Sequence, residues 1–361
     1  MILFSLLLAF IVVFISVPAI VNVAHLKKLY DVPGRRKSHT SATPNLGGIA
    51  LFAGFTIAAG IFIDITQSKE FIQLLIALII LFFVGIKDDI LVIAPAKKLY
   101  GEILATIVLV IMGDVRFTSL HGFLGIYHID YMWSIALTCF VVIVIINSFN
   151  LIDGIDGLAS GIGMVVALTF GIWFYLVEQY NYAILCAGLL GSLASFFGYN
   201  VFGKSNKIFM GDTGSLIIGL LMSLIVIKFN EVNIIYTGSF AVNSAPAVSF
   251  GVLMLPLFDT MRVFIIRISN GQSPFHSDKN HLHHKMLQLG LSHLSSTSVL
   301  LGLNLLFIII AFTFQRLGVI SLMLLNIFIG LLFNVITELL IYRVKHKDIG
   351  QLTARRHHVR A

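Results

Sequence analysis

The sequence predicts an all-α fold, a polytopic integral membrane bundle of about eleven transmembrane helices. The first observation is composition, because 58% of the 361 residues are hydrophobic and the mean hydropathy is +0.97. The second is charge, because only 11% of the residues are charged, whereas a soluble domain carries roughly 25%. The third is that the apolar residues gather into stretches of about bilayer length.

These apolar stretches are long enough, or nearly so, to cross a hydrocarbon core of about 30 Å. Several are shorter than the usual ~20 residues, so we expect those helices to tilt or to be buried among their neighbours. The first stretch has no basic residue before it and a basic segment after it, which predicts an uncleaved anchor. The eleven stretches cover residues 2–24, 46–63, 71–86, 99–112, 131–146, 158–177, 182–199, 214–229, 246–264, 297–315 and 318–342.

Lysine and arginine are distributed unequally between the two sides of the membrane that this arrangement creates. With the N-terminus outside, 20 of the 24 basic residues lie in cytoplasmic segments. Because positive charge is retained on the cytoplasmic side, the N-terminus is predicted outside and the C-terminus inside the cell. The net charge of +7 is then mainly a topology signal, which also attracts anionic membrane lipids. Nucleic acid is not an expected partner.

The chain is expected to form one transmembrane catalytic domain over residues 1–345, followed by a basic cytoplasmic tail over residues 346–361. No internal repeat, low-complexity segment or soluble domain stands out. Cys139 and Cys186 both lie inside apolar stretches, so no disulfide framework is predicted.

A polar stretch, NSFNLIDGIDGLA (residues 147–159), follows the fifth apolar stretch directly. A carboxylate close to the bilayer is costly unless it contacts water, pairs with a cation or binds metal. Asp153 and Asp156 are three residues apart, so on a helical turn they would share one face. Together with Asn147 and Asn150 they offer oxygen ligands of the kind that suit Mg²⁺. Taken alone, the stretch is equally compatible with a polar loop that solvates two helix ends.

Further aspartates on the same predicted membrane face strengthen the hypothesis of a metal site. Asp88 and Asp89 are adjacent in GIKDDILVIAPAKKL, and neighbouring carboxylates repel unless a metal or cation neutralises them. Asp212 in GDTG either caps a helix or holds a metal ion beside a phosphate. Because these acids share a face with Asp153 and Asp156, we predict a metal-dependent site there.

A histidine cluster, His281, His283 and His284, lies in the long loop after the ninth stretch. Zinc is disfavoured, because no cysteine is nearby and the acids lie in other loops. Histidines among basic side chains suit an anionic or polyhydroxylated ligand better, while a solvated basic loop remains the alternative. His357 and His358, in the basic tail, are given no role.

Five motifs now resemble the polyprenyl-phosphate N-acetylhexosamine-1-phosphate transferases, a glycosyltransferase family 4-like group. The resemblance covers nearly the whole chain, in the family's order and with its eleven-span layout. Its H-x-H-H form is similar to the branch that uses UDP-N-acetylglucosamine or a related UDP-N-acetylhexosamine. The motifs are PNLGG, GIKDD followed by KKL, NSFNLIDGIDGLA, FMGDTGS and SPFHSDKNHLHH.

The resemblance implies transfer of a sugar-1-phosphate, first of all N-acetylglucosamine-1-phosphate, from a UDP-N-acetylhexosamine to undecaprenyl phosphate or a similar polyprenyl phosphate. UMP would be released, and the lipid-linked sugar would start a cell-envelope polysaccharide such as lipopolysaccharide or teichoic acid. It further implies Mg²⁺, with Mn²⁺ able to substitute, and an active site on the cytoplasmic face of a bacterial cytoplasmic membrane. A homodimer is left open.

The resemblance also implies roles for single residues. Asn150 and Asp212 are expected to hold Mg²⁺. Asp88 and Asp89 are expected to position or deprotonate the carrier phosphate, which Lys98 binds. The neighbouring Lys97 is the alternative to Lys98, although the K-L pairing of the motif favours the latter.

The soluble donor is expected to meet other residues. Asp156, with Asp153 near it, should face the nucleotide, and the histidine loop should hold the diphosphate and the N-acetylated sugar. The expected catalytic residues are Asp88, Asp89, Asp153, Asp156 and Asp212. The expected substrate-binding residues are Lys98, Asn147, Asn150, Asp156, Arg267, His281, His283 and His284.

Two other classes of protein are compatible with parts of the pattern. A transporter would show ionisable groups near mid-bilayer and repeated halves, whereas these acids gather at one face. Another Mg²⁺-dependent membrane lipid phosphotransferase or phosphatase would share the acids. The D-G-x-x-A-R pattern of CDP-alcohol transferases is not met, because Ala159 is followed by Ser160.

The orientation can be tested with Ser295→Cys. In intact cells this cysteine should resist a membrane-impermeant thiol reagent, and in inverted vesicles it should react, because the positive-inside rule puts its segment in the cytoplasm. The parent protein, whose two cysteines lie in apolar stretches, is the control. Labelling from outside would contradict the orientation and the use of a cytoplasmic UDP-sugar.

Overall fold

The computed structural model describes residues 1–29, 43–66, 70–273 and 278–358. Within these ranges the fold is all-α, as predicted, and β-pairing is limited to isolated bridges such as the one between Phe123 and Ile126. Cys139 and Cys186 are both free. Some of the basic residues used for the orientation lie outside the described residues, namely Arg35, Arg36, Lys37, Lys69 and Arg360.

Ten of the eleven predicted stretches coincide, to within six residues at their ends, with one helix or with two consecutive helices, whereas the helix of the last stretch, 318–342, continues to His358. The elements are α1 (Ile2–Lys27), α2 (Gly47–Phe62), α3 (Glu70–Leu91), α4 (Pro95–Ile107), the π-helix η1 (Val108–Met112), α5 (Tyr131–Ile152), α6 (Leu158–Leu176), α7 (Tyr180–Phe202), α8 (Gly211–Ile235), α9 (Ala245–Val252), α10 (Met254–Ser269), α11 (Leu282–Gln288), α12 (His293–Thr313), the 3₁₀ helix η2 (Gln315–Leu317) and α13 (Val319–His358).

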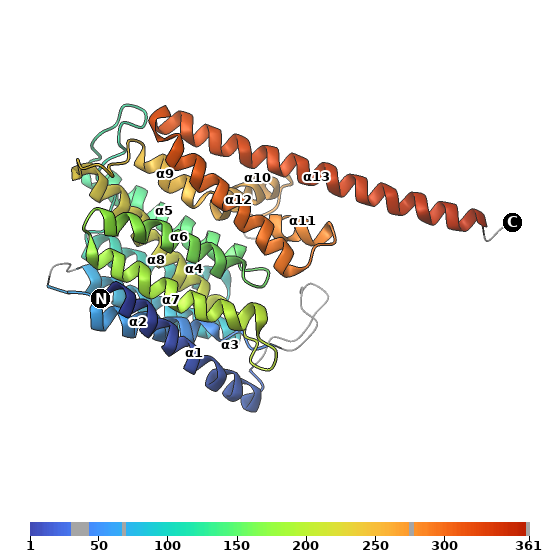
Figure 1. The fold of residues 1–361 in the computed structure, drawn as a ribbon, viewed down its shortest axis with the longest axis horizontal. Helices are drawn as coiled ribbons and strands as arrows, with labels where there is room; N and C mark the ends of the chain where they lie inside the picture. Colours follow the sequence, from blue (N-terminus) through green and yellow to red (C-terminus); the bar gives the residue numbers. More distant parts are fainter. Residues whose placement is uncertain (30–42, 67–69, 274–277, 359–361) are drawn as a thin grey trace.

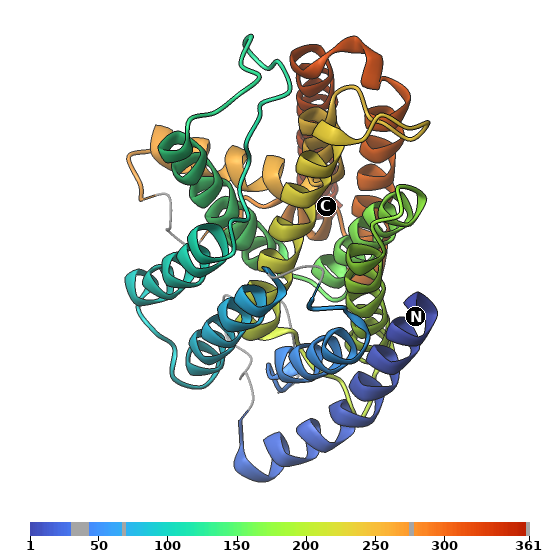
Figure 2. The same ribbon diagram turned by 90° about the vertical axis from the view of Figure 1, so that its left-hand side faces the viewer.

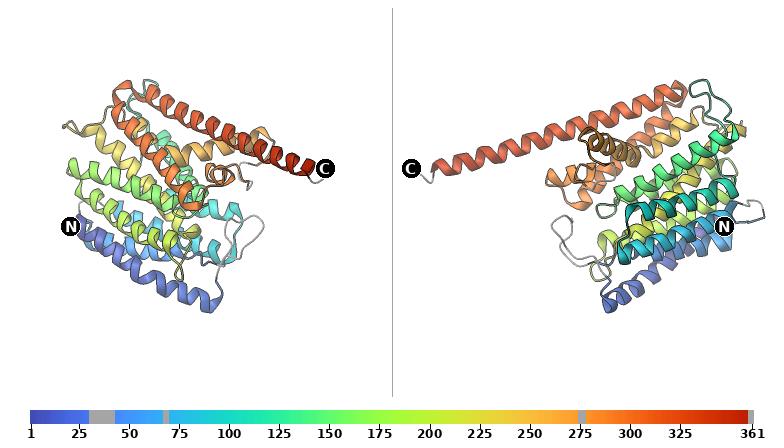
Figure 3. Two further views of the ribbon diagram at one scale, coloured as in Figure 1. Left: turned by 45° about the vertical axis from the view of Figure 1, so that its right-hand side comes forward. Right: turned by 180° about the vertical axis from the view of Figure 1, so that it is seen from behind.

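Length and composition qualify fewer of these helices as membrane spans. Seven helices of the described chain are long and apolar enough to cross a membrane, or eight if α9 and α10, which meet at a 78° bend, form one span. The count of eleven spans is therefore not confirmed; α2, for example, has only 16 residues. The N-terminus and the C-terminal end of α13 lie at opposite ends of the bundle, and α13 extends well beyond it (Figures 1 and 3).

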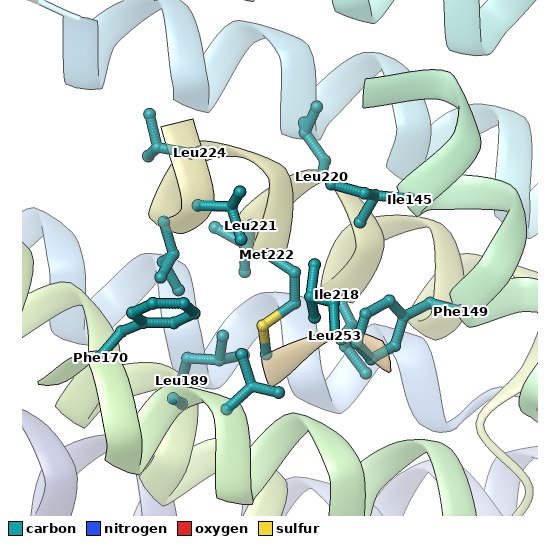
Figure 4. Close-up of a cluster of buried hydrophobic side chains, with 14 of the residues drawn as sticks. Ile145, Phe149, Phe170, Leu189, Ile218, Leu220, Leu221, Met222, Leu224 and Leu253 are labelled. Carbon is teal, nitrogen blue, oxygen red and sulfur yellow. The ribbon is translucent and has the colours of Figure 1, made fainter. Parts of the chain in front are cut away.

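The central helix of the bundle is α8. It packs against α2, α3, α5, α6 and α9, and Figure 2 shows it enclosed by other helices. Every residue from Thr213 to Ile227 is buried, so this helix is apolar on all sides. Figure 4 shows its leucine, isoleucine and methionine side chains between Ile145 and Phe149 of α5 on one side and Phe170 and Leu189 of α6 and α7 on the other.

Glycines let α2 and α3 approach the beginning of α8 closely. A Cβ atom added at Gly48 would lie 2.2 Å from the backbone N of Gly214, and one added at Gly85 would lie 2.3 Å from Cα of Thr213. Because these neighbours are backbone atoms, they cannot move aside as a flexible side chain could. The two glycines therefore set how near α2 and α3 come to α8.

The segment before α2 also pairs with the segment before α8. The backbone N–H of Phe209 donates to the carbonyl of Pro44 at 2.7 Å, and the N–H groups of Gly47 and Gly48 donate to Phe209 and Met210 at 2.9 Å. The PNLGG motif thus holds the entrance of α8 through its backbone, which explains why a small, turn-forming sequence is found there.

The polar stretch after the fifth apolar stretch begins inside a helix. Because α5 continues to Ile152, Asn147 and Asn150 lie on its last turns. Asp153 and Asp156 lie in the turn that leads to α6. The shared helical face that their spacing would give does not form, because Gly157, with φ +78°, starts α6 only after them.

We expect Gly85→Ala to destabilise the protein, because the added methyl group would overlap the backbone of Thr213. Overpacking of this kind costs about 1–3 kcal/mol of the free energy of unfolding. Gly198→Ala, in α7, is the matched control, because a Cβ atom there meets nothing within 4 Å. Thermal unfolding in detergent measures both, and an equal response of the two variants would contradict the close packing of α3 on α8.

Candidate active site

The side chain of Lys98 lies at the centre of a polar cluster where α3 and α5 end and α4 and α8 begin. Its ammonium group is 3.3 Å from Asp88 Oδ2 and 3.3 Å from Asn150 Oδ1, and it also contacts Asp212 Oδ1. These residues come from α3, α4, α5 and α8, and we call them the Lys98 cluster. Lys97, the alternative, is exposed.

Asp89 contacts the start of α8 and not Lys98, with which its neighbour Asp88 pairs. Its carboxylate accepts hydrogen bonds from the backbone N–H groups of Asp212 and Thr213, at 2.7 and 3.1 Å, and from the Thr213 hydroxyl at 2.6 Å. It therefore satisfies the first free N–H groups of α8, as a capping residue does. The alternative role for Asp212, capping of α8, is therefore taken by Asp89, which is distant in sequence.

Gly211 makes this capping contact possible. Its φ is +73°, and a Cβ atom there would lie 2.6 Å from Asp89 Oδ1 and 2.1 Å from the carbonyl oxygen of Asn45. A side chain at this position would be strained in its backbone and would collide with both neighbours. The glycine before Asp212 thus belongs to the capping geometry.

The expected metal ligands Asn150 and Asp212 are in direct contact, with Asn150 Nδ2 2.5 Å from Asp212 Oδ1. The same amide nitrogen lies 2.9 Å from the Ser215 hydroxyl. No group of three or more His, Cys, Asp and Glu side chains within the described ranges is arranged to hold a metal ion. The oxygens of Asp88, Asn150 and Asp212 nevertheless converge on one cationic group.

Asp156 is paired with two basic residues from other parts of the chain. Its Oδ2 atom is 2.7 Å from Lys207 Nζ and 3.1 Å from His293 Nδ1, and its carbonyl oxygen accepts a hydrogen bond from Thr297. Although burial raises the pKa of the Asp156 carboxyl, the hydrogen bonds from His293 and Lys207 outweigh it and lower that pKa.

Asp153, in the same turn, has the opposite electrostatic environment. Burial raises the pKa of its carboxyl to about 8, and the negative charges of Asp212, Asp89 and Asp156 add to this effect. Among the described residues, Asp153 forms no ion pair. The two aspartates of the turn therefore differ, because only Asp156 is stabilised as a carboxylate.

The segment predicted as a histidine loop is packed and partly helical, because His281 is the N-cap of α11 and His283 and His284 lie in its first turn. We keep the name histidine loop for residues 278–284. His281 Nδ1 lies 2.9 Å from Asp259 Oδ2, and the other oxygen of Asp259 accepts from the Leu282 N–H and from Arg262. Arg267, 2% exposed, donates to Asp278 at 2.9 Å. Arg267 therefore helps to hold the loop in place as well as lying beside His281.

His283 packs this loop against the turn that carries the two aspartates, residues 153–156, which we call the acidic turn. The side chain is 2% exposed, and a Cβ atom added at Gly154 would lie 2.2 Å from His283 Nε2. Burial, with His284 adding to it, lowers the pKa of His283 to about 3. His284 lies against His283 with the two rings tilted, their centroids 4.2 Å apart. It is half-buried, whereas His281 and His283 are buried.

Several residues around the site were not predicted from the sequence. Glu102, 1% exposed, accepts a hydrogen bond from Asn147 Nδ2 at 2.5 Å. Lys207 and His293 pair with Asp156, and Asp259 holds His281. The i, i+4 spacing of Lys98 and Glu102 is the one local signal that could have indicated such a neighbour.

The comparisons with known proteins agree with this geometry. Residues 71–230 match the model of glycosyl transferase family 4. A decaprenyl-phosphate N-acetylglucosaminephosphotransferase of Mycobacterium leprae is 31% identical over 285 residues, which cover 72% of this chain and 70% of that protein. An undecaprenyl-phosphate alpha-N-acetylglucosaminyl 1-phosphate transferase of Yersinia pestis is 30% identical over 266 residues, 73% of this chain and 70% of that protein. This chain belongs to glycosyl transferase family 4.

The matched part of this family 4 protein contains the whole Lys98 cluster and the acidic turn, from Asp88 to Asp212. The histidine loop lies outside it. An Escherichia coli relative, also an undecaprenyl-phosphate alpha-N-acetylglucosaminyl 1-phosphate transferase, is 29% identical over 272 residues, 74% of this chain and 72% of that protein. The resemblance that the motifs indicated is thus confirmed at the level of the family.

The burial of His283 predicts a specific pH dependence. Its folded-state pKa of about 3 lies below the ordinary value of 6.5, so below about pH 6.5 the unfolded chain binds a proton that the folded chain does not. The free energy of unfolding should therefore fall by up to about 2 kcal/mol between about pH 7 and about pH 5.

His283→Gln should lack this part of the pH dependence, and His128→Gln, at an exposed loop position, should keep it. Thermal unfolding of the three proteins in detergent at both pH values is the measurement. If all three lose the same stability on acidification, His283 is solvated and the packed histidine loop is contradicted.

Proposed function

We propose that this protein transfers N-acetylglucosamine-1-phosphate from a UDP-N-acetylhexosamine, with UDP-N-acetylglucosamine as the first choice, to undecaprenyl phosphate or a similar polyprenyl phosphate. UMP is released, and the lipid-diphosphate-linked sugar starts a cell-envelope polysaccharide. The observation that carries this proposal is the convergence of Asp88, Asn150 and Asp212 on the Lys98 ammonium group. The names and sequences of the polyprenyl-phosphate relatives support it.

The donor set of the Lys98 cluster fits Mg²⁺. Its oxygens come from two carboxylates and one amide, which are ligands that hard cations prefer. Asn150 and Asp212 would hold the ion, with Asp88 beside them. When bound, Mg²⁺ would offset the charge of the phosphates during the displacement. Mn²⁺ takes similar ligands and is expected to substitute.

The protein's own residues account for the handling of the lipid phosphate. Lys98 is already held among negative groups, so it can turn to the incoming phosphate and neutralise part of its charge. Asp88, beside it, is placed to orient that phosphate. An oxygen of the lipid phosphate then forms a bond to the sugar-bearing phosphorus of the donor, and the bond from this phosphorus to UMP breaks.

The acidic turn and the histidine loop support a site for the donor. Asp156, kept as a carboxylate by Lys207 and His293, offers acceptors to the nucleotide. His284 is the least buried of the three histidines and is the one best able to contact the diphosphate or the sugar. His281 and Arg267 would act mainly by holding the loop against the acidic turn.

A site at one end of a membrane bundle suits this pair of substrates, because one is dissolved in water and the other in lipid. We therefore propose the cytoplasmic face of a bacterial cytoplasmic membrane as its location. A transporter fits less well, because the Lys98 cluster, the acidic turn and the histidine loop all gather at one end rather than near mid-bilayer.

The proposal is tested by incubating the purified protein with UDP-N-acetylglucosamine, undecaprenyl phosphate and Mg²⁺ and measuring UMP. EDTA should abolish release, and Mg²⁺ or Mn²⁺ should restore it. Asp212→Asn should lower the rate by about two orders of magnitude, since it removes a charge from the cation site. Asp114→Asn, at an exposed carboxylate of the opposite end, is the control and should keep full activity. Full activity in EDTA would contradict the metal proposal.

A further inference from the structure

Two polar contacts join α4 to α5 about one helical turn apart. In the first, Lys98 Nζ lies 3.3 Å from Asn150 Oδ1; in the second, Asn147 Nδ2 lies 2.5 Å from Glu102 Oε2. Lys98 and Glu102 are four residues apart on α4, and the two asparagines are three apart on α5, so each pair occupies one helix face. The first contact belongs to the Lys98 cluster and the second does not.

Glu102 is an unusual residue for its surroundings. It is 1% exposed and forms no ion pair within the described residues. Lys98, one turn away, pairs with Asp88 and Asp212. A buried carboxylate that lacks an ion pair is costly. A neutral apolar residue would pack α4 at less cost, so the carboxylate needs an explanation other than stability.

The contact between Glu102 and Asn147 also fixes the orientation of the asparagine side chain. Asn147 Nδ2 donates to Glu102 and also to the backbone carbonyl of Ile143, at 2.9 Å, which uses both of its N–H groups. The neighbouring residue on α4, Gly101, packs on Val84 of α3, where an added Cβ atom would lie 2.5 Å from Val84 Cγ2. Helix α4 therefore contacts α3 at Gly101 and α5 at Glu102, which are consecutive residues.

We infer that Glu102 is a positioning residue for the Lys98 cluster. By holding Asn147, its carboxylate sets the rotation and the height of α4 relative to α5, and thereby the point from which the Lys98 side chain reaches Asn150 and Asp212. The inference rests on the proposed function, because its effect is measured on the use of the polyprenyl phosphate.

The geometry and the charge of Glu102 can be separated by substitution. Glu102→Gln keeps an acceptor oxygen at the same reach but loses the charge, whereas Glu102→Asp keeps the charge but withdraws it by one methylene. If the reach of the acceptor oxygen matters more than its charge, the glutamine variant keeps most of the activity and the aspartate variant loses it. Glu102→Ala should lower kcat/KM for the polyprenyl phosphate by about 10- to 100-fold, since misplacement by about 1 Å has effects of that size.

Titration of each substrate separates positioning from general damage. Glu102→Ala should change the kinetics with the polyprenyl phosphate and leave KM for the UDP-sugar unchanged, as Lys98→Ala does if Lys98 binds the lipid phosphate. The double variant Lys98→Ala/Glu102→Ala should be no worse than Lys98→Ala alone, because Glu102 acts through Lys98. Stabilisation of the purified protein by added polyprenyl phosphate, seen in thermal unfolding, gives a second measure without turnover.

The matched control is Glu231→Ala. Glu231 is a half-buried carboxylate at the opposite end of α8, where it accepts two hydrogen bonds from Thr118 at 2.8 and 2.7 Å. This variant also loses a carboxylate with its hydrogen bonds, yet it should leave the kinetics with both substrates unchanged.

Three results would overturn the inference while the wild type remains active: unchanged kinetics in Glu102→Ala and Glu102→Asp, equal losses with both substrates, or a loss in Glu102→Gln as large as in Glu102→Asp. If the alanine variant does not accumulate, the comparison of the glutamine and aspartate variants decides alone. A wild-type protein that neither releases UMP nor is stabilised by a polyprenyl phosphate would overturn the proposed function, and this inference with it.

Discussion

The capping of α8 by Asp89 is the contact on which the site depends. The first N–H groups of α8 have no partner within the helix, and the helix is buried from Thr213 onward, so these donors would be costly without an acceptor. Asp89 supplies both carboxylate oxygens to them. In doing so it ties the end of α3 to the start of α8, and this brings Asp88 and Asp212 to the same lysine.

Backbone packing makes that contact possible. Gly85 and Gly48 let α3 and α2 reach the first turn of α8, and Gly211 leaves room for the Asp89 carboxylate. Small residues allow helices to approach closely where lipid offers no hydrophobic drive for association. The polar groups are then held by a rigid frame of helix ends, which is the condition for electrostatic stabilisation without reorganisation.

The sequence was sufficient for the order and the helical type of the apolar stretches, because apolar runs and turn residues are local signals. It was also sufficient to gather the acids at one end. It could not show that α5 extends through Asn147 and Asn150, since asparagine favours helix caps and turns over helix interiors. Nor could it show that Asp156 pairs with Lys207 and His293, because contacts between helices distant in the chain leave no periodic signal.

The contact between His283 and Gly154 limits which substitutions the chain tolerates at these two positions. The imidazole occupies the space that a side chain at position 154 would need, although the two residues lie in different parts of the sequence. A substitution at either position alone leaves an overlap or a hole. A change at position 283 therefore constrains the residue at position 154, and a histidine loop grafted from another protein would carry its own requirement for that residue.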